Sequence, residues 1–223
     1  MSAFESTLVT VYTSSAPSKS TPETGFLRLA ITGEAGLLLL AWGLGRWLNV
    51  SPLQELRPTA SGILWGLIAT APLLPGLWWM LNSSLTSIRR LVALVVTHLG
   101  PLLAPYSMAA LAVLACTAGI AEEVLFRGLI QPGLAPWLTP LGALLVTSAL
   151  FGLLHFVSRA YAGFAAVMGL YLGALLLLVD NLLAPIITHG LYDFVALICV
   201  ARRYRAGYGA SQSPTEHIPN SLH

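Results

Sequence analysis

Ionisable side chains interrupt three apolar stretches in the second half of the chain. The stretches read EEVLFRG (122–128), FGLLH (151–155) and HGLYD (189–193). A charged group in apolar surroundings costs several kcal/mol unless it is paired, so such residues are rarely kept without a function. Four of them lie on three separate helices and are hard to explain as packing, so we predict that Glu122, His155, His189 and Asp193 meet in one site. The ionisable residues are Glu122, Glu123, Arg127, His155, His189 and Asp193.

The two adjacent glutamates are expected to have different roles. Glu123 and Arg127 are four residues apart, which places them on one helix face and favours a salt bridge. Glu122 is rotated by about 100° from Glu123 and therefore points elsewhere. We interpret Glu123 and Arg127 as a mutually neutralising pair and Glu122 as a carboxylate left free for chemistry.

The four remaining polar residues have the types needed to hydrolyse a peptide bond. A carboxylate beside an imidazole can take a proton from water and make it a nucleophile. A second imidazole with a hydrogen-bonding neighbour can stabilise the oxyanion of a tetrahedral intermediate. No serine or cysteine has an evident nucleophile setting. The candidate catalytic residues are therefore Glu122, His155, His189 and Asp193, with Phe151 one helical turn before His155.

Two other interpretations of these residues stay open. Histidines and carboxylates also suit zinc, although the HExxH pattern of many zinc proteases is absent. We expect no cofactor, with zinc as the alternative. The polar residues could also line a proton or ion path in a transporter or a non-enzymatic scaffold. The absence of paired repeats in the two halves of the chain disfavours that function.

Composition predicts the elements that must position this site. Of the 223 residues, 56% are hydrophobic and 9% charged, a balance typical of a polytopic membrane protein. We predict an all-α bundle of six membrane helices, with 87–106 as a further helix lying at the interface because Gly100 and Pro101 interrupt it. The six spans are 27–48, 60–82, 107–130, 139–158, 161–179 and 182–201.

The distribution of basic residues predicts the orientation. With six spans, eight Lys and Arg residues fall on one side and two on the other, which places both termini in the cytoplasm. The eight are Lys19, Arg28, Arg89, Arg90, Arg159, Arg202, Arg203 and Arg205, and the two are Arg46 and Arg57. Gly169 and Gly173 form a GxxxG pair, which we interpret as a close helix contact.

The ends of the chain and three isolated residues have simpler interpretations. We expect residues 1–25 and 206–223 to be disordered tails around one transmembrane domain, 26–205. Cys116 and Cys199 are interpreted as buried small hydrophobic residues. Glu34 has no obvious partner, so we place it near a helix end or in a packing role.

The three motifs, taken in order on membrane helices, resemble those of one protease family. EEVLFRG resembles an EExxxR motif, FGLLH resembles FxxxH, and HGLYD resembles HxxxN/D. These are motifs of the CAAX prenyl proteases and bacteriocin-processing enzymes (the CPBP or Abi family), which are intramembrane proteases. The similarity covers about residues 87–200.

The resemblance implies an activity and assigns roles to individual residues. Glu122 would be the base that activates water, with His155 assisting, and His189 with Asp193 would form the oxyanion site. The implied partners are the lipid bilayer and a polypeptide substrate reached from the membrane, prenylated or bearing a leader. No nucleic acid is expected, and the sequence leaves the oligomeric state open. We expect a multi-pass protein of a bacterial plasma membrane.

Overall fold

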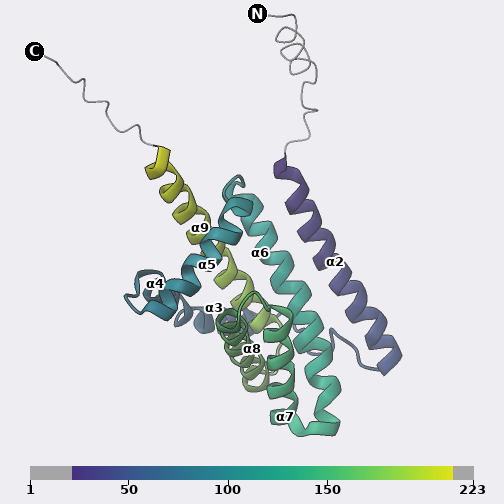
Figure 1. Cartoon of the computed structure of the whole chain (residues 1–223). Helices are drawn as coiled ribbons and strands as arrows, with labels where there is room; N and C mark the ends of the chain where they lie inside the picture. The colour runs from purple at the N-terminus through teal and green to yellow at the C-terminus, as the bar shows by residue number, and fades with distance from the viewer. Residues whose placement is uncertain (1–21, 213–223) are drawn as a thin grey trace, which may run out of the picture.

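The fold is an all-helical bundle whose long helices have lengths and compositions suited to a membrane. The structure, a computed structural model, describes residues 22–212, and no strand occurs among them. Five helices are long and apolar enough to cross a membrane. They are Gly25–Leu48, Ala60–Asn82, Met108–Leu154, Arg159–Val179 and Leu183–Gly207. The expected architecture of a polytopic helical bundle is confirmed (Figure 1).

The count differs from the six expected spans because two of them join. The segment Met108–Leu154 comprises α6 (Met108–Glu123), η1 (Val124–Ile130) and α7 (Gln131–Leu154). Its 47 residues would extend roughly 70 Å as one straight helix, about twice the thickness of a bilayer core. Thr139, with φ 65 and ψ 160, breaks it between Pro136 and Pro140. The chain turns back there to form a helical hairpin (Figure 1).

The first arm of this hairpin is longer than the sequence indicated. We expected a helix over 107–130, yet the helix continues to the break at Thr139. The seven residues before Gln131 adopt the wider π-helical winding, and Gln131 N–H donates to Phe126 O. Pro132 lies at the start of α7, where a missing N–H is tolerated, so the proline does not terminate the arm.

The second membrane segment and the stretch that follows it are built from three shorter helices. α3 (Ala60–Thr70) and α4 (Leu73–Asn82) divide the expected single span 60–82 at Pro72. α5 (Thr86–Leu103) matches the expected interfacial helix and is not among the candidate spans. Pro101 lies within the last turn of α5 and does not break it earlier.

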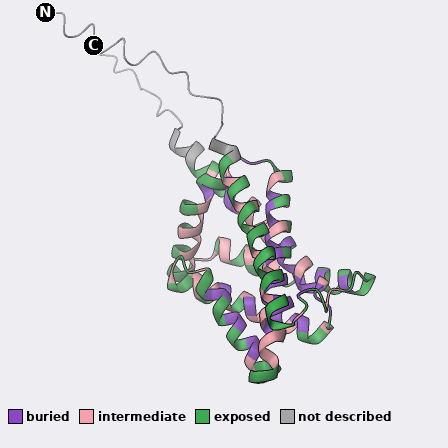
Figure 2. Cartoon of the chain, turned by 90° about the vertical axis from the view of Figure 1, so that its right-hand side faces the viewer, coloured by how far each residue is buried: buried purple, intermediate pink, exposed green. Residues whose placement is uncertain are grey.

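The remaining helices surround the hairpin. α8 (Arg159–Val179) begins at Ser158, whose side chain accepts from Tyr161 N–H, and packs against α7. α9 (Leu183–Gln212) packs along α6, α3 and α5. α2 (Pro22–Leu48) contacts α6 and η1 from the other side. Figure 2 shows that burial is concentrated where helices face one another, while green, exposed residues cover the outer surfaces.

The expected burial of the two cysteines needs correction. Cys116 is exposed and Cys199 half-buried, because both lie on outward helix faces that lipid would cover in a membrane protein. Helix α2 already begins at Pro22, and α9 continues to Gln212, a few residues beyond the expected domain limits. The tails predicted for the rest of 1–25 and 206–223 lie outside the described residues.

Candidate active site

Glu122 lies between two imidazoles. Its Oε2 atom is 3.6 Å from His155 Nε2 and 4.0 Å from His189 Nε2. Both separations are longer than a direct hydrogen bond, and within residues 22–212 this oxygen accepts none. The Glu122 side chain is only 13% exposed. The structure thus brings together three of the four residues expected to share a site, and the carboxylate oxygen facing both imidazoles remains available to a further group.

His155 reaches Glu122 because the hairpin arms are of equal length. Glu122 is 17 residues before Thr139 and His155 is 16 residues after it, so antiparallel arms place them at the same level. A first arm ending at residue 130 would instead leave His155 on the order of 10 Å deeper than Glu122. The continuation of the helix to Thr139 therefore assembles this half of the site.

Hydrogen bonding fixes the orientation of His155. Its Nδ1 atom lies 2.8 Å from Phe151 O, and its ring stacks on Phe151 with a centroid distance of 4.3 Å. A carbonyl oxygen can only accept, so Nδ1 carries the proton and donates. This arrangement leaves Nε2 directed at Glu122. The four-residue spacing of Phe151 and His155 therefore directs Nε2 of the imidazole toward Glu122.

His189 is held by carboxylates on both nitrogens. Nδ1 donates to Glu123 Oε1 at 2.8 Å, and Nε2 lies 3.4 Å from Asp193 Oδ2. His189 is buried, with 6% of its surface exposed. The sequence had suggested only an ion-pairing role for Glu123. The structure adds that Glu123 also orients an imidazole of the candidate site, a long-range contact that no local spacing indicates.

Arg127 links the ion pair to the rest of the bundle. Its Nη1 donates to Glu123 Oε1 at 2.8 Å, as the i, i+4 spacing predicted, and its Nη2 donates to Gly169 O at 2.9 Å. The guanidinium lies 4.6 Å from the centre of the Phe151 ring. The side chains of Arg127 and Glu123 are both fully buried. Arg127 thereby joins η1, α7 and α8 around the base of the site.

Glycines let the helices approach closely enough for these contacts. A Cβ at Gly169 would lie 3.2 Å from Ser148 Cα, so the predicted GxxxG contact joins α8 to α7. A Cβ at Gly119 would lie 2.8 Å from Gly190 N, which allows α6 and α9 to cross almost backbone to backbone. Gly190 follows His189, so this crossing brings His189 to the two glutamates.

The structure also places Glu34 near the site, where sequence analysis had not put it. Glu34 is in the middle of α2, on a packing face whose positions follow a coiled-coil-like three- and four-residue spacing: Leu27, Ala30, Glu34, Leu37, Ala41 and Leu44. Its Oε2 atom is buried without a hydrogen-bond partner in the described part of the chain. Its charge interacts with Glu122, His189 and Asp193. The interruption of this apolar face was the available signal.

The π-helix η1 is a second feature that sequence analysis missed. It begins directly after Glu123 and contains Arg127. Single turns of π-helix occur often at functional sites, because their extra residue changes the direction of neighbouring side chains. Gly128 in η1 has no room for a Cβ, since the carbonyl of Pro52 packs against it. That contact fixes η1 against the loop after α2.

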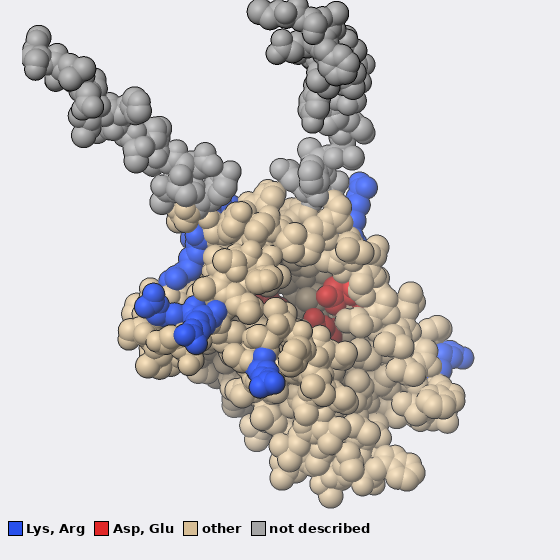
Figure 3. All heavy atoms as spheres, in the orientation of Figure 1, with Lys and Arg blue, Asp and Glu red and all other residues tan. Residues whose placement is uncertain are grey.

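The site opens on one face of the bundle. Figure 3 shows acidic side chains at the wall of a hollow over α6, between α9 on one side and α2 on the other. Lys and Arg gather instead on the left of this view, over α4, α5 and the upper part of α9, where the sequence places Arg89, Arg90, Arg202 and Arg203. The acidic groups at the hollow are thus separated from the basic surface.

The arrangement of the side-chain donors bears on metal binding. Within the described residues, no group of three or more His, Cys, Asp or Glu side chains is arranged to hold a metal ion. The Nδ1 atoms of His155 and His189 are already bonded to Phe151 O and Glu123. The two Nε2 atoms and the Glu122 carboxylate remain as the groups that face one another.

Part of the chain matches a known protein family. Residues 104–195 match the family model described as type II CAAX prenyl endopeptidase Rce1-like. This segment is similar to the CAAX protease family. The match contains all three motifs and confirms the resemblance that the motifs indicated. No curated protein and no solved structure matches the chain.

The family match indicates the coarse function. The family match supports an intramembrane endopeptidase, and with the apolar helices it supports a multi-pass membrane protein acting on a polypeptide substrate. It favours the protease over the transporter or scaffold considered from the sequence. The roles of the individual site residues stay predictions that the geometry can support.

Proposed function

We propose that this protein is a glutamic-type intramembrane endopeptidase in which Glu122 activates the attacking water. The supporting observation is the position of Glu122 Oε2, buried, without a hydrogen-bond partner in the described structure, and facing two imidazole Nε2 atoms at 3.6 and 4.0 Å. A base for water needs an accepting oxygen that no protein donor already occupies.

The proposed reaction proceeds through one tetrahedral intermediate. Glu122 takes a proton from water while His155 Nε2 helps orient it, and the hydroxide forms a bond to the carbon of the scissile carbonyl. The carbonyl oxygen becomes an oxyanion, to which His189, as an imidazolium supported by Glu123 and Asp193, donates from Nε2. The C–N bond then breaks, and the leaving nitrogen receives the proton held by Glu122.

We propose a membrane-associated polypeptide as the substrate. An apolar groove of about 170 Å³ between α4, α5, α8 and α9 extends to Asp193. Leu91, Val95 and Tyr192 are among the residues lining it. A groove of this character favours a substrate with an apolar segment or anchor entering from the bilayer. We also propose a bacterial plasma membrane location with both termini in the cytoplasm, from the bias of basic residues.

The decisive experiment compares wild-type protein with Glu122→Gln. Gln has nearly the shape of Glu but cannot act as the base, and general-base catalysis contributes about 10²–10⁴-fold. We expect Glu122→Gln to fold normally and to lose cleavage by about that factor. A comparison of membrane proteomes should then show a polypeptide left uncleaved. Glu55→Gln, at a glutamate paired with Arg57 away from the site, is the control. Full proteolysis by Glu122→Gln would contradict the mechanism.

A further inference from the structure

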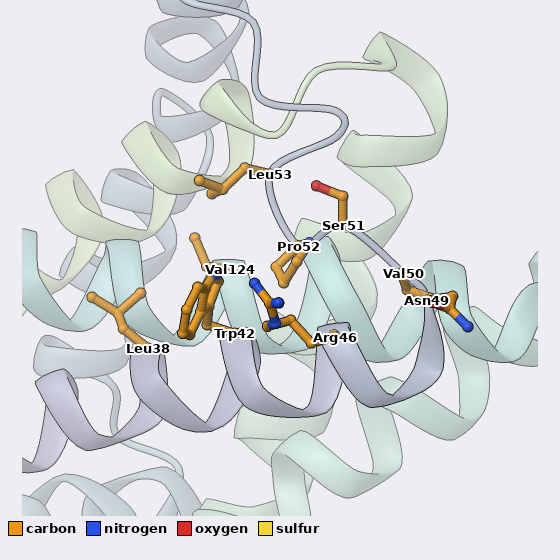
Figure 4. Close-up of a pocket in the computed structure, with 10 residues that line it drawn as sticks. Leu38, Trp42, Arg46, Asn49, Val50, Ser51, Pro52, Leu53 and Val124 are labelled. Carbon is orange, nitrogen blue, oxygen red and sulfur yellow. The ribbon is translucent and has the colours of Figure 1, made fainter.

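A second pocket lies at the C-terminal end of α2, apart from the candidate active site. It has a volume of about 650 Å³ and lies between α2, the loop 49–53 and the start of η1. Figure 4 shows apolar Leu38, Trp42 and Leu53 at one end, and Asn49, Val50 and Ser51 at the other. Arg46 lies between the two groups. The pocket is therefore amphipathic along its length.

The wall of this pocket is a rigid turn. Val50 N–H donates to Gly45 O at 2.9 Å, and the ring of Pro52 packs so closely on Gly45 that a Cβ there would lie 2.9 Å from it. Asn49 has φ 55, the left-handed conformation that reverses the chain after a helix. The carbonyl of Pro52 packs against Gly128 of η1. The turn is thus clamped between α2 and η1.

The charge of Arg46 is uncompensated by the residues that the structure describes. Among the described residues, its guanidinium contacts the Trp42 ring, with 5.1 Å from the guanidinium carbon to the ring centre. By contrast, Arg57, on the same expected side of the membrane, is paired with Glu55 at 2.8 Å and Asp180 at 3.1 Å. No acidic residue lines the pocket. An exposed cation without a carboxylate, next to a hydroxyl and an amide, suits a phosphate group.

We propose that this pocket binds an anionic glycerophospholipid. Its phosphate pairs with the Arg46 guanidinium, its polar headgroup lies toward Asn49 and Ser51, and the start of an acyl chain lies along Leu38 and Trp42. Arginine presents a planar set of donors that matches phosphate oxygens. A choline or ethanolamine cation would find no carboxylate in the lining, so phosphatidylglycerol is favoured over zwitterionic lipids.

The position of the pocket gives the bound lipid a structural role. The pocket includes Val124, the second residue after Glu122 and the first of η1. Bound lipid would contact α2 and η1 together and hold them against each other. This inference is independent of the proposed catalytic mechanism, because Arg46 lies outside the candidate active site.

The experiment is native mass spectrometry of the full-length protein in detergent. Phosphatidylglycerol, phosphatidylcholine and inorganic phosphate are titrated separately against wild type, Arg46→Gln and Arg57→Gln. We expect wild type to prefer phosphatidylglycerol to phosphatidylcholine, and Arg46→Gln to lose about tenfold in phosphatidylglycerol affinity, as the loss of a charge-assisted contact predicts. Arg57→Gln should keep the preference, because exposed ion pairs contribute little to stability and its charge is already paired.

A photoactivatable phosphatidylglycerol provides a second measurement that does not depend on a folded variant. On wild type, the label should attach within residues 38–53. Equal binding of both lipids by wild type, an unchanged preference in Arg46→Gln, or labelling outside this segment would each overturn the proposal. Tight binding of inorganic phosphate that displaces no lipid would show a simple anion site and would overturn it too.

Discussion

At the scale of single residues, the two adjacent glutamates have opposite surroundings. Glu122 Oε2 faces the Nε2 atoms of His155 and His189 without a hydrogen bond. Glu123 Oε1 instead accepts hydrogen bonds from Arg127 and His189, while Glu123 Oε2 has no partner in the described structure. One residue of helix separates them, yet the rotation of about 100° directs one toward the open site and the other into the core. The same side-chain chemistry therefore serves a candidate base in one case and a structural anchor in the other.

Replacing Glu123 should chiefly destabilise the protein. Glu123→Gln removes the counter-charge of a fully buried arginine, a loss of roughly 3–5 kcal/mol for a broken buried pair. It also weakens the bond that orients His189. We expect reduced expression and a lower free energy of unfolding, measured in detergent by denaturant titration. Glu122→Gln should leave unfolding almost unchanged, and equal stability of the two variants would refute this division of roles.

We expect Glu34 to lower the stability of the protein and to support its activity. Its buried oxygen without a partner interrupts an apolar packing face, and an unsatisfied buried polar group costs about 1–3 kcal/mol. Glu34→Leu continues that face and should raise the free energy of unfolding by about 1 kcal/mol. Because Glu34 is within electrostatic reach of Glu122 and His189, we expect lower cleavage activity from the same variant.

The matched control for Glu34 is Thr32→Leu. Thr32 is exposed, two residues away on α2, and its hydroxyl bonds only to backbone carbonyls of the same helix. The Thr32→Leu variant should change neither the free energy of unfolding nor the cleavage rate appreciably. A Glu34→Leu protein that is more stable and fully active would show that Glu34 has only a packing role.

At the scale of elements, the site depends on two places where helices come close together. The hairpin turn at Thr139 brings Glu122 and His155 level, and the crossing of α6 with α9 brings His189 to both glutamates. The π-helical turn between Glu123 and Gln131 lets the first arm run through Pro132 to that hairpin. These features determine distances within the site although none of them contributes a candidate catalytic side chain.

Enlarging Gly119 should separate α6 from α9. A Cβ at this position would lie 2.8 Å from Gly190 N, and backbone cannot move aside as a flexible side chain can. We expect Gly119→Val to destabilise the fold by about 1–3 kcal/mol, as overpacking does, and to abolish cleavage. Gly163→Val is the control, because a Cβ at Gly163 in α8 meets nothing within 4 Å. Similar losses of activity in both variants would argue against the crossing as their cause.

At the scale of the whole molecule, the bundle encloses a polar site inside an apolar exterior. Exposed tryptophans lie near the ends of the hairpin and of α2 and α4, as expected for residues at a membrane interface: Trp47, Trp78, Trp79 and Trp137. The hollow between α2 and α9 offers a side entrance to the acidic groups (Figure 3). Such an arrangement suits a substrate that diffuses in the bilayer.

Activity of the purified protein should survive metal chelation. We propose hydrolysis by carboxylate and imidazole alone, so exhaustive treatment with a chelator should leave the cleavage rate unchanged. Elemental analysis should then find only substoichiometric metal. Stoichiometric zinc, with activity lost on chelation and restored only when zinc is returned, would require a metal-assisted mechanism in its place.

Several features of this protein could be predicted from the spacing of residues along the chain. The apolar runs predicted a membrane helix bundle, and the i, i+4 spacing of Glu123 and Arg127 predicted their ion pair, which the structure contains at 2.8 Å. The motifs also predicted which histidines accompany Glu122. These features follow from sequence because helix geometry relates residues within one turn, whatever the rest of the fold does.

Tertiary structure alone decided how separate helices meet. The level of His155 depends on where the hairpin turns, and the first arm extends to Thr139, beyond its expected end at residue 130. The bond between Glu123 and His189 joins residues 66 positions apart, and the approach of Glu34 depends on how α2 packs against α6. A chain pattern specifies the face on which a side chain lies, but the partner opposite that face is set by helix length, crossing and packing between segments distant in sequence.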